Sequence, residues 1–490
     1  MTTGTGTGVV QFNTTAVSSS PYHFTNNGTG AGTAVSVHGT VSVVNTAGVN
    51  VLDGSANDYT GGTIVHGGTL VAAVTGALPS AGSVAINGLA ANGTAELSLS
   101  ASQAIGSLTF GGTGAGLNSV NLLTIASGVN LTLGGNITYD ATNNPAAASI
   151  QGATGTVILD APRTFDVGDS SNAPVDLYVY APINGAGGLV KAGNGTLSLN
   201  AANSYAGDTN VNGGVLAVAN QNALGTGNLH LDGGTVRLTN GITSVPNSIS
   251  FDATHGGTLA GNWTFTSAQT FGAGVTLSPG NSPGHMNFTD LTLTGGSADF
   301  EFRAATGAPG TDWDFFSLTG TLNLTGLSAG GYTLKVISLD LNNTQGGQIS
   351  SLSGATSWII ASANAISGFN AANFTIDSSQ FYGGGVFALT QINQDLVLNF
   401  TPVPGAFHLR AAGRGPLPQR PRRLAQAPEC LIAGGANPPD EPSCLRCLHG
   451  SSGGFACTRY CTSARECSAE VEKLRAIAAG IAADARPGPG

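Results

Sequence analysis

Two pairs of carboxylates in this sequence are spaced so that they could act together. Asp299 and Glu301 alternate with phenylalanines, and Asp312 and Asp314 flank a tryptophan. Alternate residues of a β-strand share one face, so each pair could supply the acid and base of a glycosidase or hold calcium. However, no Asp-x-Asp-x-Asp-Gly loop completes a calcium site. We therefore interpret both pairs as parts of solvated strand faces and expect no catalytic residue and no metal ligand there.

Zinc binding is the second chemistry to consider, because all six cysteines fall in residues 405–490. Cys444 and Cys447 form one Cys-x2-Cys pair, which is half of a common tetrahedral zinc site. The later cysteines at positions 457, 461 and 467 are separated by three and five residues, so they do not complete a second pair. We expect no metal and no cofactor.

A polysaccharide lyase is the main enzymatic alternative. Such a site needs a base beside the charged group of the substrate, usually with further Lys or Arg to neutralise that group. The first 404 residues contain five basic residues, which are widely separated: Arg163, Lys191, Arg237, Arg303 and Lys335. The histidines are scattered as well: His23, His38, His66, His230, His255 and His285. We expect no enzyme, and a carbohydrate-active enzyme (a polysaccharide lyase or a glycosidase) remains the alternative.

Charge divides the chain near Pro404. Residues 1–404 contain 19 Asp and Glu against 5 Lys and Arg, a net charge of −14, whereas residues 405–490 have 11 Lys and Arg against 7 acidic residues, or +4. An acidic body argues against nucleic acid as a partner, because phosphate neutralisation needs clustered cations. The 74 glycines and the 9% of charged residues are unusual for a globular domain, yet 41% hydrophobic residues suffice for a core.

The elements that would position any site are organised by a duplication. Residues 57–72 return as residues 203–218, an offset of 146, with the pattern Asn-x-Tyr-x-Gly-x-Thr-x-Val-x-Gly-Gly-x-Leu in the second copy. Each copy predicts a short strand, a Gly-Gly corner and another strand, since glycine allows a tight corner and β-branched residues suit a pleated surface. The residues that define the repeat are Asn57, Tyr59, Gly61, Thr63, Gly67, Gly68 and Leu70, and Asn203, Tyr205, Gly207, Thr209, Gly213, Gly214 and Leu216. We assign the two tyrosines to packing, and His66, which replaces Asn212, to a surface turn.

This pattern, with the run Leu-Asp-Gly-Gly-Thr-Val at 231–236 and the lead-in at 189–199, resembles the autotransporter-associated β-strand repeat, or passenger-associated repeat. The resemblance covers about residues 186–238 and, less closely, 45–90. It implies an all-β fold, a right-handed parallel β-helix (β-solenoid), exported to a bacterial cell surface. Short strands without helix signals over the first 404 residues agree with stacked rungs of about 20–25 residues.

Three regions are expected. Residues 1–280 would form the β-helix, and residues 281–404 a β-rich closing region that caps its open end. Two Pro-Gly turns within residues 277–284 would prevent regular strand pairing through that stretch. In the family this chain resembles, such a turn marks the last part of a displayed rod.

Residues 405–490 form a Pro-, Arg- and Cys-rich tail, which we expect to be disordered or out of frame. Related exported proteins carry a Val-Pro-Glu-Pro sorting signal where this chain has Gly405 instead of glutamate. A reading-frame shift after Pro404 would explain the change, and a genuine tail is the alternative. The start lacks the basic and apolar regions of a signal peptide, so we expect a chain that begins inside a repeat.

The function expected from these observations is structural or adhesive, in an exported protein located at the cell surface or outside the cell. Partners would be an extracellular polysaccharide or the surface of a host or neighbouring cell, with no nucleic acid, no membrane span in this chain and a monomeric state. Besides the carbohydrate-active enzyme, one further alternative is a spacer for a functional domain that this chain lacks.

Overall fold

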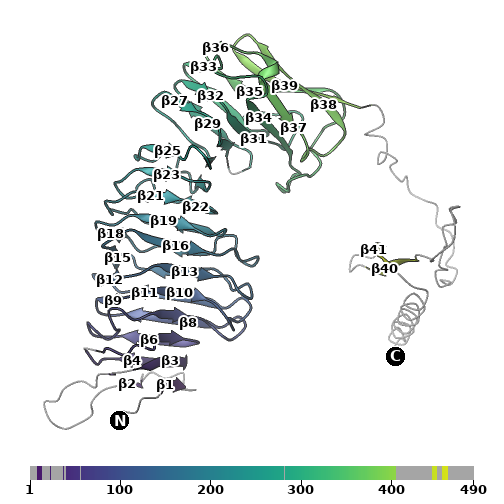
Figure 1. Ribbon diagram of the computed structural model, residues 1–490. Helices are drawn as coiled ribbons and strands as arrows, with labels where there is room; N and C mark the ends of the chain where they lie inside the picture. Colours follow the sequence, from purple (N-terminus) through teal and green to yellow (C-terminus); the bar gives the residue numbers. More distant parts are fainter. Residues whose placement is uncertain are drawn as a thin grey trace, which may run out of the picture. The chain divides into compact units, whose positions relative to one another are not determined.

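The computed structural model describes residues 8–13, 22–23, 37, 40–55, 57–280 and 282–403, together with the strands 444–449 and 455–461 (Figure 1). Residues 8, 12–13, 22–23 and the last two strands are described by their backbone alone. The predictions for the chain start, for His38 and for most of the tail, including the sorting signal, lie outside the described residues. The chain divides into two units, Met1–Ala411 and Ala412–Gly490.

Two long parallel sheets run through the first unit, and successive rungs add one strand to each as far as β25 and β26, after which only the second sheet continues (Figure 1). One sheet has the order β1 (Gly8–Asn13), β3 (Val41–Ala47), β5 (Thr63–Val65), β7 (Val84–Ile86), β10 (Leu108–Gly111), β13 (Ile137–Asp140), β16 (Arg163–Val167), β19 (Leu189–Ala192), β21 (Thr209–Val211), β23 (Leu229–Leu231) and β25 (Ile249–Phe251). The other has the order β2 (Tyr22–His23), β4 (Val49–Leu52), β6 (Gly68–Ala72), β8 (Thr94–Leu99), β11 (Val120–Ile125), β14 (Ala148–Gln151), β17 (Leu177–Val179), β20 (Thr196–Leu199), β22 (Val215–Val218), β24 (Thr235–Leu238), β26 (Gly257–Gly261), β28 (Val275–Pro279), β31 (Gly296–Phe302), β34 (Tyr332–Ser338) and β37 (Phe374–Asp377).

Side chains alternate along these strands between a buried inner face and an outer face. In β5 and β21, the first and third residues are buried and the middle one is half-buried. Stacking keeps this order from rung to rung, because Leu189 lies beside Thr209, which in turn lies beside Leu229. The inner residues of each rung therefore continue one core, and the predicted all-β, parallel β-helix fold is confirmed.

Rungs in the middle of the stack are longer than predicted. Leu108 lies beside Ile137, so the chain takes a longer path here before it returns to the same sheet. These rungs contain a third strand, in a short parallel sheet with the order β18 (Ile183–Asn184), β15 (Thr156–Leu159), β12 (Asn130–Leu133) and β9 (Gln103–Ile105). The rung with a compact corner steps by 20 residues, from Leu189 to Thr209, whereas the rungs of this stretch with a third strand range from 24 residues, between Val84 and Leu108, to 29, between Leu108 and Ile137.

Two further sheets complete the later rungs. One is parallel, with the order β27 (Gln269–Phe271), β30 (Leu291–Leu293), β33 (Thr321–Asn323) and β36 (Ala365–Ser367). The other has the order β29 (His285–Phe288), β32 (Phe315–Leu318), β35 (Thr356–Ser362), β39 (Asp395–Pro402) and β38 (Gly385–Ile392), and its last three strands are antiparallel. A 3-10 helix, η1, spans Ala371–Asn373.

The second long sheet continues past residue 280, because β28 lies beside β31 and β31 beside β34. The boundary between the two predicted domains stays a prediction. The first proline of the Pro-Gly pair does not interrupt pairing: Leu277, Ser278 and Pro279 align with residues 259–261 in β26. Of the described residues that follow, Ser282, Pro283 and Gly284 lie outside the strands. A proline at a strand end removes one donor at most.

Aromatic side chains join the rungs just before residue 281 to those of the closing region. Trp263 stacks on Phe265 with ring centroids 5.6 Å apart, and Phe265 stacks on Phe288 at 5.1 Å. Phe316 contacts Phe288 at 5.6 Å and Phe300 at 5.0 Å. These rings come from several strands and loops and form one column. This column continues the hydrophobic core through the region where the rung shape changes.

In the second unit, the backbones of β40 (Cys444–His449) and β41 (Phe455–Cys461) pair antiparallel. The cysteine side chains considered above for zinc lie outside the described residues. Throughout the described part of the chain, no helix has the length and apolar character to cross a membrane.

The corner between β21 and β22 generates a stability prediction. Gly214 has a φ of +58°, and a Cβ there would overlap the carbonyl oxygen of Gly195 on the previous rung. At Gly213 the nearest atom to such a Cβ is the Gly193 carbonyl oxygen at 3.4 Å, which is an ordinary contact. We expect Gly214→Ala to lower the free energy of unfolding by about 2 kcal/mol or more, and Gly213→Ala to cost less than about 1 kcal/mol.

Urea titration of the two variants, followed by circular dichroism, measures this difference. Equal midpoints for Gly213→Ala and Gly214→Ala would contradict the account of the corner.

Candidate functional site

The predicted repeat residues form a compact corner that takes the place of a third strand. In the second copy, Asn203 lies above β18, where its Oδ1 accepts the N–H of Ile183 at 2.8 Å. Its Nδ2 donates to the carbonyl of Ala223 at 2.5 Å, so one amide connects the rung before with the rung after. Tyr205 is fully buried, and its hydroxyl lies 2.6 Å from Oγ1 of Thr209.

The first copy repeats this geometry. Asn57 accepts the N–H of Val37 at 2.6 Å and donates to the carbonyl of Ala77 at 2.8 Å. The Tyr59 hydroxyl lies 2.6 Å from Oγ1 of Thr63. Burial raises the pKa of Tyr59 to about 12, and burial raises the pKa of Tyr205 as well. Both tyrosines are therefore neutral core residues that are out of reach of a ligand.

The remaining predicted repeat residues also contribute to packing and to turns. Leu70 and Leu216 are fully buried in β6 and β22. Gly68 is the first residue of β6. The other five glycines lie on the turns that enter or leave the strands of each copy: Gly61, Gly67, Gly207, Gly213 and Gly214. His66 is half-buried on the turn between β5 and β6, with Nδ1 3.0 Å from the carbonyl oxygen of Asn87.

A buried ammonium group is a feature that sequence reasoning missed. Lys191 is fully buried, and its Nζ donates to the carbonyls of Ala192, Gly193 and Gly213 at 2.6, 2.9 and 3.1 Å. Burial lowers its pKa to about 8. The offset between the two copies places Asn45 at the same position in the first copy, where its Nδ2 donates to the carbonyl of Gly67 at 2.7 Å. The sequence contained one sign of this buried group, because Lys191 takes an inward position in the alternation of β19.

The carboxylate pairs are not the solvated faces that the alternation indicated. Asp314 is fully buried and accepts the N–H groups of Gly284 and Glu301 at 2.6 and 2.8 Å. Glu301 is only 8% exposed, and it accepts hydrogen bonds from Ser282 and Gln345 at 2.5 and 3.1 Å. Burial, and next the charge of Glu301, raises the pKa of Asp314 well above its ordinary value. Ser282 and Gly284 of the Pro-Gly turn bind these two groups, which lie in the interior and not on a solvated strand face.

The other two carboxylates pair with cations. Asp299 lies 3.2 Å from Nζ of Lys335 on the neighbouring strand, and Asp312 lies 3.6 Å from Arg303. Arg163 instead donates from Nε to the carbonyl of Leu133. Together with Lys191, four of the five basic residues of the body thus have separate partners.

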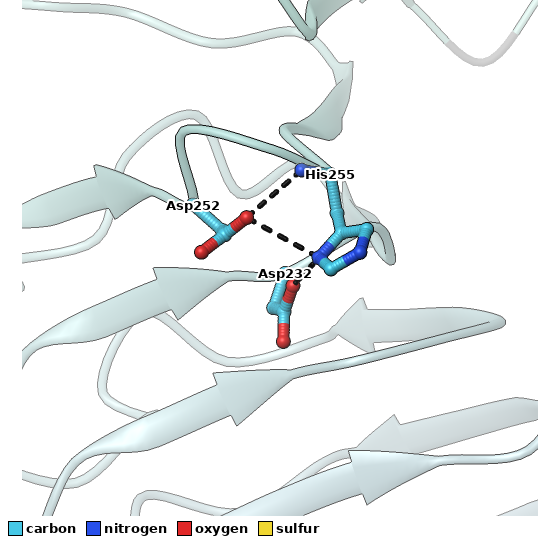
Figure 2. A group of neighbouring side chains, drawn as sticks. All are labelled: Asp232, Asp252 and His255. Carbon is cyan, nitrogen blue, oxygen red and sulfur yellow. Dashed lines mark hydrogen bonds and ion pairs between the residues drawn. The ribbon is translucent and has the colours of Figure 1, made fainter.

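One cluster of possible cation ligands lies on the surface, at an outer corner of the stack (Figure 2). Asp232 and Asp252 follow β23 and β25 at the same position in successive rungs. Nδ1 of His255 lies 2.6 Å from Oδ1 of Asp232 and 3.2 Å from Oδ1 of Asp252. The backbone N–H groups of His255 and Thr254 lower the pKa of Asp252. One nitrogen and two oxygens could hold a divalent cation, but the hydrogen bonds between them already account for the arrangement.

Comparison with known proteins adds to this geometry. Residues 47–72 and 189–218 match the family described as passenger-associated-transport-repeat. The chain carries two passenger-associated transport repeats. Every residue predicted to define the repeat falls within these two ranges. A stretch of 113 residues, 22% of this chain, is 41% identical to a part of the Adhesin BmaC autotransporter of Brucella suis biovar 1 (strain 1330). That match spans 3% of the length of the relative.

The two passenger-associated transport repeats fall on rungs of one kind. Their second strands, β6 and β22, belong to rungs whose third side is the Asn-Tyr corner. The rungs that contain β9, β12, β15 and β18 lie between the two repeats. In the repeat, polar residues in the interior hold the corner that replaces this third strand.

The buried ammonium of the second repeat gives a prediction. Lys191→Asn should cost less stability than Lys191→Leu, because the amide can still donate to one carbonyl, as Asn45 does in the first repeat. The leucine leaves three buried carbonyls without this donor, each worth about 1–3 kcal/mol. Between the folded-state pKa of about 8 and the ordinary 10.5, the unfolded chain holds the proton that the folded chain has lost, so stability rises with pH.

Urea midpoints at several pH values test this role. Both variants should lose the rise above pH 8 that the wild type has. Equal midpoints for Lys191→Asn and Lys191→Leu would contradict the role in hydrogen bonding.

The buried acid gives the opposite pH dependence. Folded Asp314 keeps its proton above the ordinary pKa of 3.8, where the unfolded chain has released it. The free energy of unfolding should therefore fall as pH rises from about 4 through the folded-state pKa. Asp314→Asn should flatten this dependence, while removing an acceptor and lowering the overall stability.

Asp312→Asn is the matched control, because Asp312 is only partly buried and faces Arg303. Thermal unfolding of the wild type and both variants from pH 4 to 8 measures the slopes. An unchanged slope in Asp314→Asn would contradict this assignment.

Proposed function

We propose that this chain is an adhesive, passenger-like region of an exported bacterial surface protein, without catalytic activity. The single observation that carries the proposal is the presence of two passenger-associated transport repeats inside one continuous parallel stack. The 41% identity to a part of an adhesin autotransporter supports adhesion over other uses of a solenoid. In this proposal the chain binds an extracellular polysaccharide or a host or neighbouring cell surface, acts as a monomer and does not bind nucleic acid.

The physical mechanism would be repetition. Each rung places its outward residues beside those of the next, so that a polar surface extends along the stack. For example, Oε2 and Oε1 of Glu96 accept hydrogen bonds from Thr69 and Thr124, the outward residues of neighbouring rungs, at 3.0 and 2.8 Å. Many weak contacts along such a surface add to a useful avidity.

A polysaccharide lyase is disfavoured by the basic residues. Its site would need cations that converge on a carboxylate in a cleft, whereas Lys191 is buried against carbonyls and Lys335, Arg303 and Arg163 have separate partners. A glycosidase is disfavoured by the carboxylates, because Asp314 holds backbone N–H groups in the interior and Asp299 and Asp312 pair with cations. The spacer alternative predicts the same fold but no binding by this chain, so adhesion measurements distinguish it.

Protease treatment of intact cells of the source bacterium tests the proposal. An antibody against the purified chain should detect a protein that surface-applied protease removes without lysis, while a cytoplasmic control protein stays intact. Beads coated with the purified chain should adhere to host or neighbouring cells more than beads coated with an unrelated acidic protein. Protection from protease until lysis would overturn the surface location, and absence of bead adhesion would favour the spacer.

A further inference from the structure

An aromatic pair lies on the outer face of the stack, away from the core that holds most other rings. Tyr178 is the outward residue of β17, between buried Leu177 and Val179. Tyr180 follows this strand and is 41% exposed. Their rings are stacked, with centroids 5.7 Å apart and an interplanar angle of 11°. The two rings thus stand nearly parallel to each other at the outer surface of one rung.

The rungs on both sides flank this surface with the same combination of groups. Ser149 of β14 and Ser198 of β20 lie beside Tyr178. On the earlier side Nε2 of Gln151 donates to Oγ of Ser149 at 3.1 Å, and on the later side Nδ2 of Asn200 donates to Oγ of Ser198 at 3.1 Å. An amide bonded to a serine two residues earlier therefore borders the tyrosine pair on each side. The sheet fixes this order, because all four groups are on or directly after paired strands.

The surface made by Tyr178, Tyr180, Gln151 and Asn200, which we call the tyrosine platform, carries no charge. In the column of outward residues that contains Tyr178, the residues beyond the two serines are Leu122 and Ala217, which are also uncharged. Charged side chains enter this column only one rung further on each side. A phosphate, a uronic acid or a basic peptide would find no countercharge within the platform. The chemistry instead suits a neutral ligand that has both an apolar face and many hydroxyl groups.

A pyranose ring has this character. Its C–H groups carry partial positive charge and fit the negative face of an aromatic ring. Its hydroxyls can exchange hydrogen bonds with amides and tyrosine hydroxyls, which offer donors and acceptors at once. The platform is also rigid, because strand pairing holds its backbone, and a preorganised surface loses little conformational entropy on binding.

We propose that the tyrosine platform binds a neutral glycan, with a sugar ring stacked on Tyr180 or Tyr178 and its hydroxyls bonded to the flanking amides. This inference rests on the proposed adhesive function and names the class of ligand at one site. A single sugar on an open platform binds weakly. Affinity for a polymer rises when neighbouring sugars or several copies of the protein engage together.

Affinity gel electrophoresis of the purified full chain tests this binding. The probes are three neutral polysaccharides, a β-glucan, an α-mannan and dextran, with polygalacturonate as the charged control. We expect retardation by at least one neutral polysaccharide and none by polygalacturonate. Tyr180→Ala should weaken the apparent affinity about tenfold, whereas Tyr180→Phe keeps the ring and should stay within about threefold.

Two further variants separate binding from folding. Asn200→Ala removes a flanking amide and should weaken binding while the urea midpoint changes little. Tyr382→Ala removes a similarly exposed tyrosine outside the platform and should leave retardation unchanged. If no neutral polysaccharide retards the wild type, or if Tyr382→Ala has the same effect as Tyr180→Ala, the proposal is overturned.

The bead assay distinguishes this failure from a failure of adhesion itself. If beads coated with wild-type and with Tyr180→Ala protein adhere equally well, the adhesive function is retained and the proposed binding at the tyrosine platform is wrong. Adhesion that depends on Tyr180 but survives enzymatic removal of cell-surface glycans would assign the platform to a protein partner and overturn the glycan. Loss of adhesion both in Tyr180→Ala and after enzymatic removal of cell-surface glycans supports the proposal.

Discussion

The hydrogen bonds between parallel rungs are the interaction on which the rest of this structure depends. Each strand of the two long sheets lies in register with the strand one rung earlier, so an inward residue always meets another inward residue. The single core that results extends as far as rungs are added. Rung length can then differ, as between the step from Leu189 to Thr209 and the longer one from Leu108 to Ile137. Only the paired strands must match, and the third side can be a strand or a corner.

Polar groups inside the stack follow from the same constraint. A tight corner turns backbone carbonyls and N–H groups inward, where water cannot satisfy them, and an unpaired buried group is costly. Asn57, Asn203 and Lys191 each supply the missing partners from a side chain. Asp314 does the same for two N–H groups beneath the Pro-Gly turn. These residues resemble candidate sites in sequence, yet they hold the backbone in place.

The sequence was sufficient for the architecture because the architecture is local and periodic. The spacing of Asn203, Tyr205 and Gly214 identified the repeat, and β-branched residues identified its short strands. The sequence also indicates strands at residues 131–133 and 155–159, but no motif marks them as the third side of a rung. The carboxylates at 301 and 314 were misassigned because alternation says which residues share a face but not whether a distant turn covers that face. The environment of Lys191 depends on carbonyls of the next rung, a relation that spacing along the chain does not express.

The asparagine that connects three rungs has a mechanical consequence. Hydrogen bonds between rungs run along the axis of the stack, so tension applied along that axis pulls directly on them. At Asn57 and Asn203 one side chain is bonded to both neighbouring rungs, and separation there must break side-chain bonds together with backbone bonds. Under load, the stack would therefore yield first at rungs that lack such a bridge, so Asn57 and Asn203 in the interior, and Glu96 on the outer face, are points of tensile reinforcement.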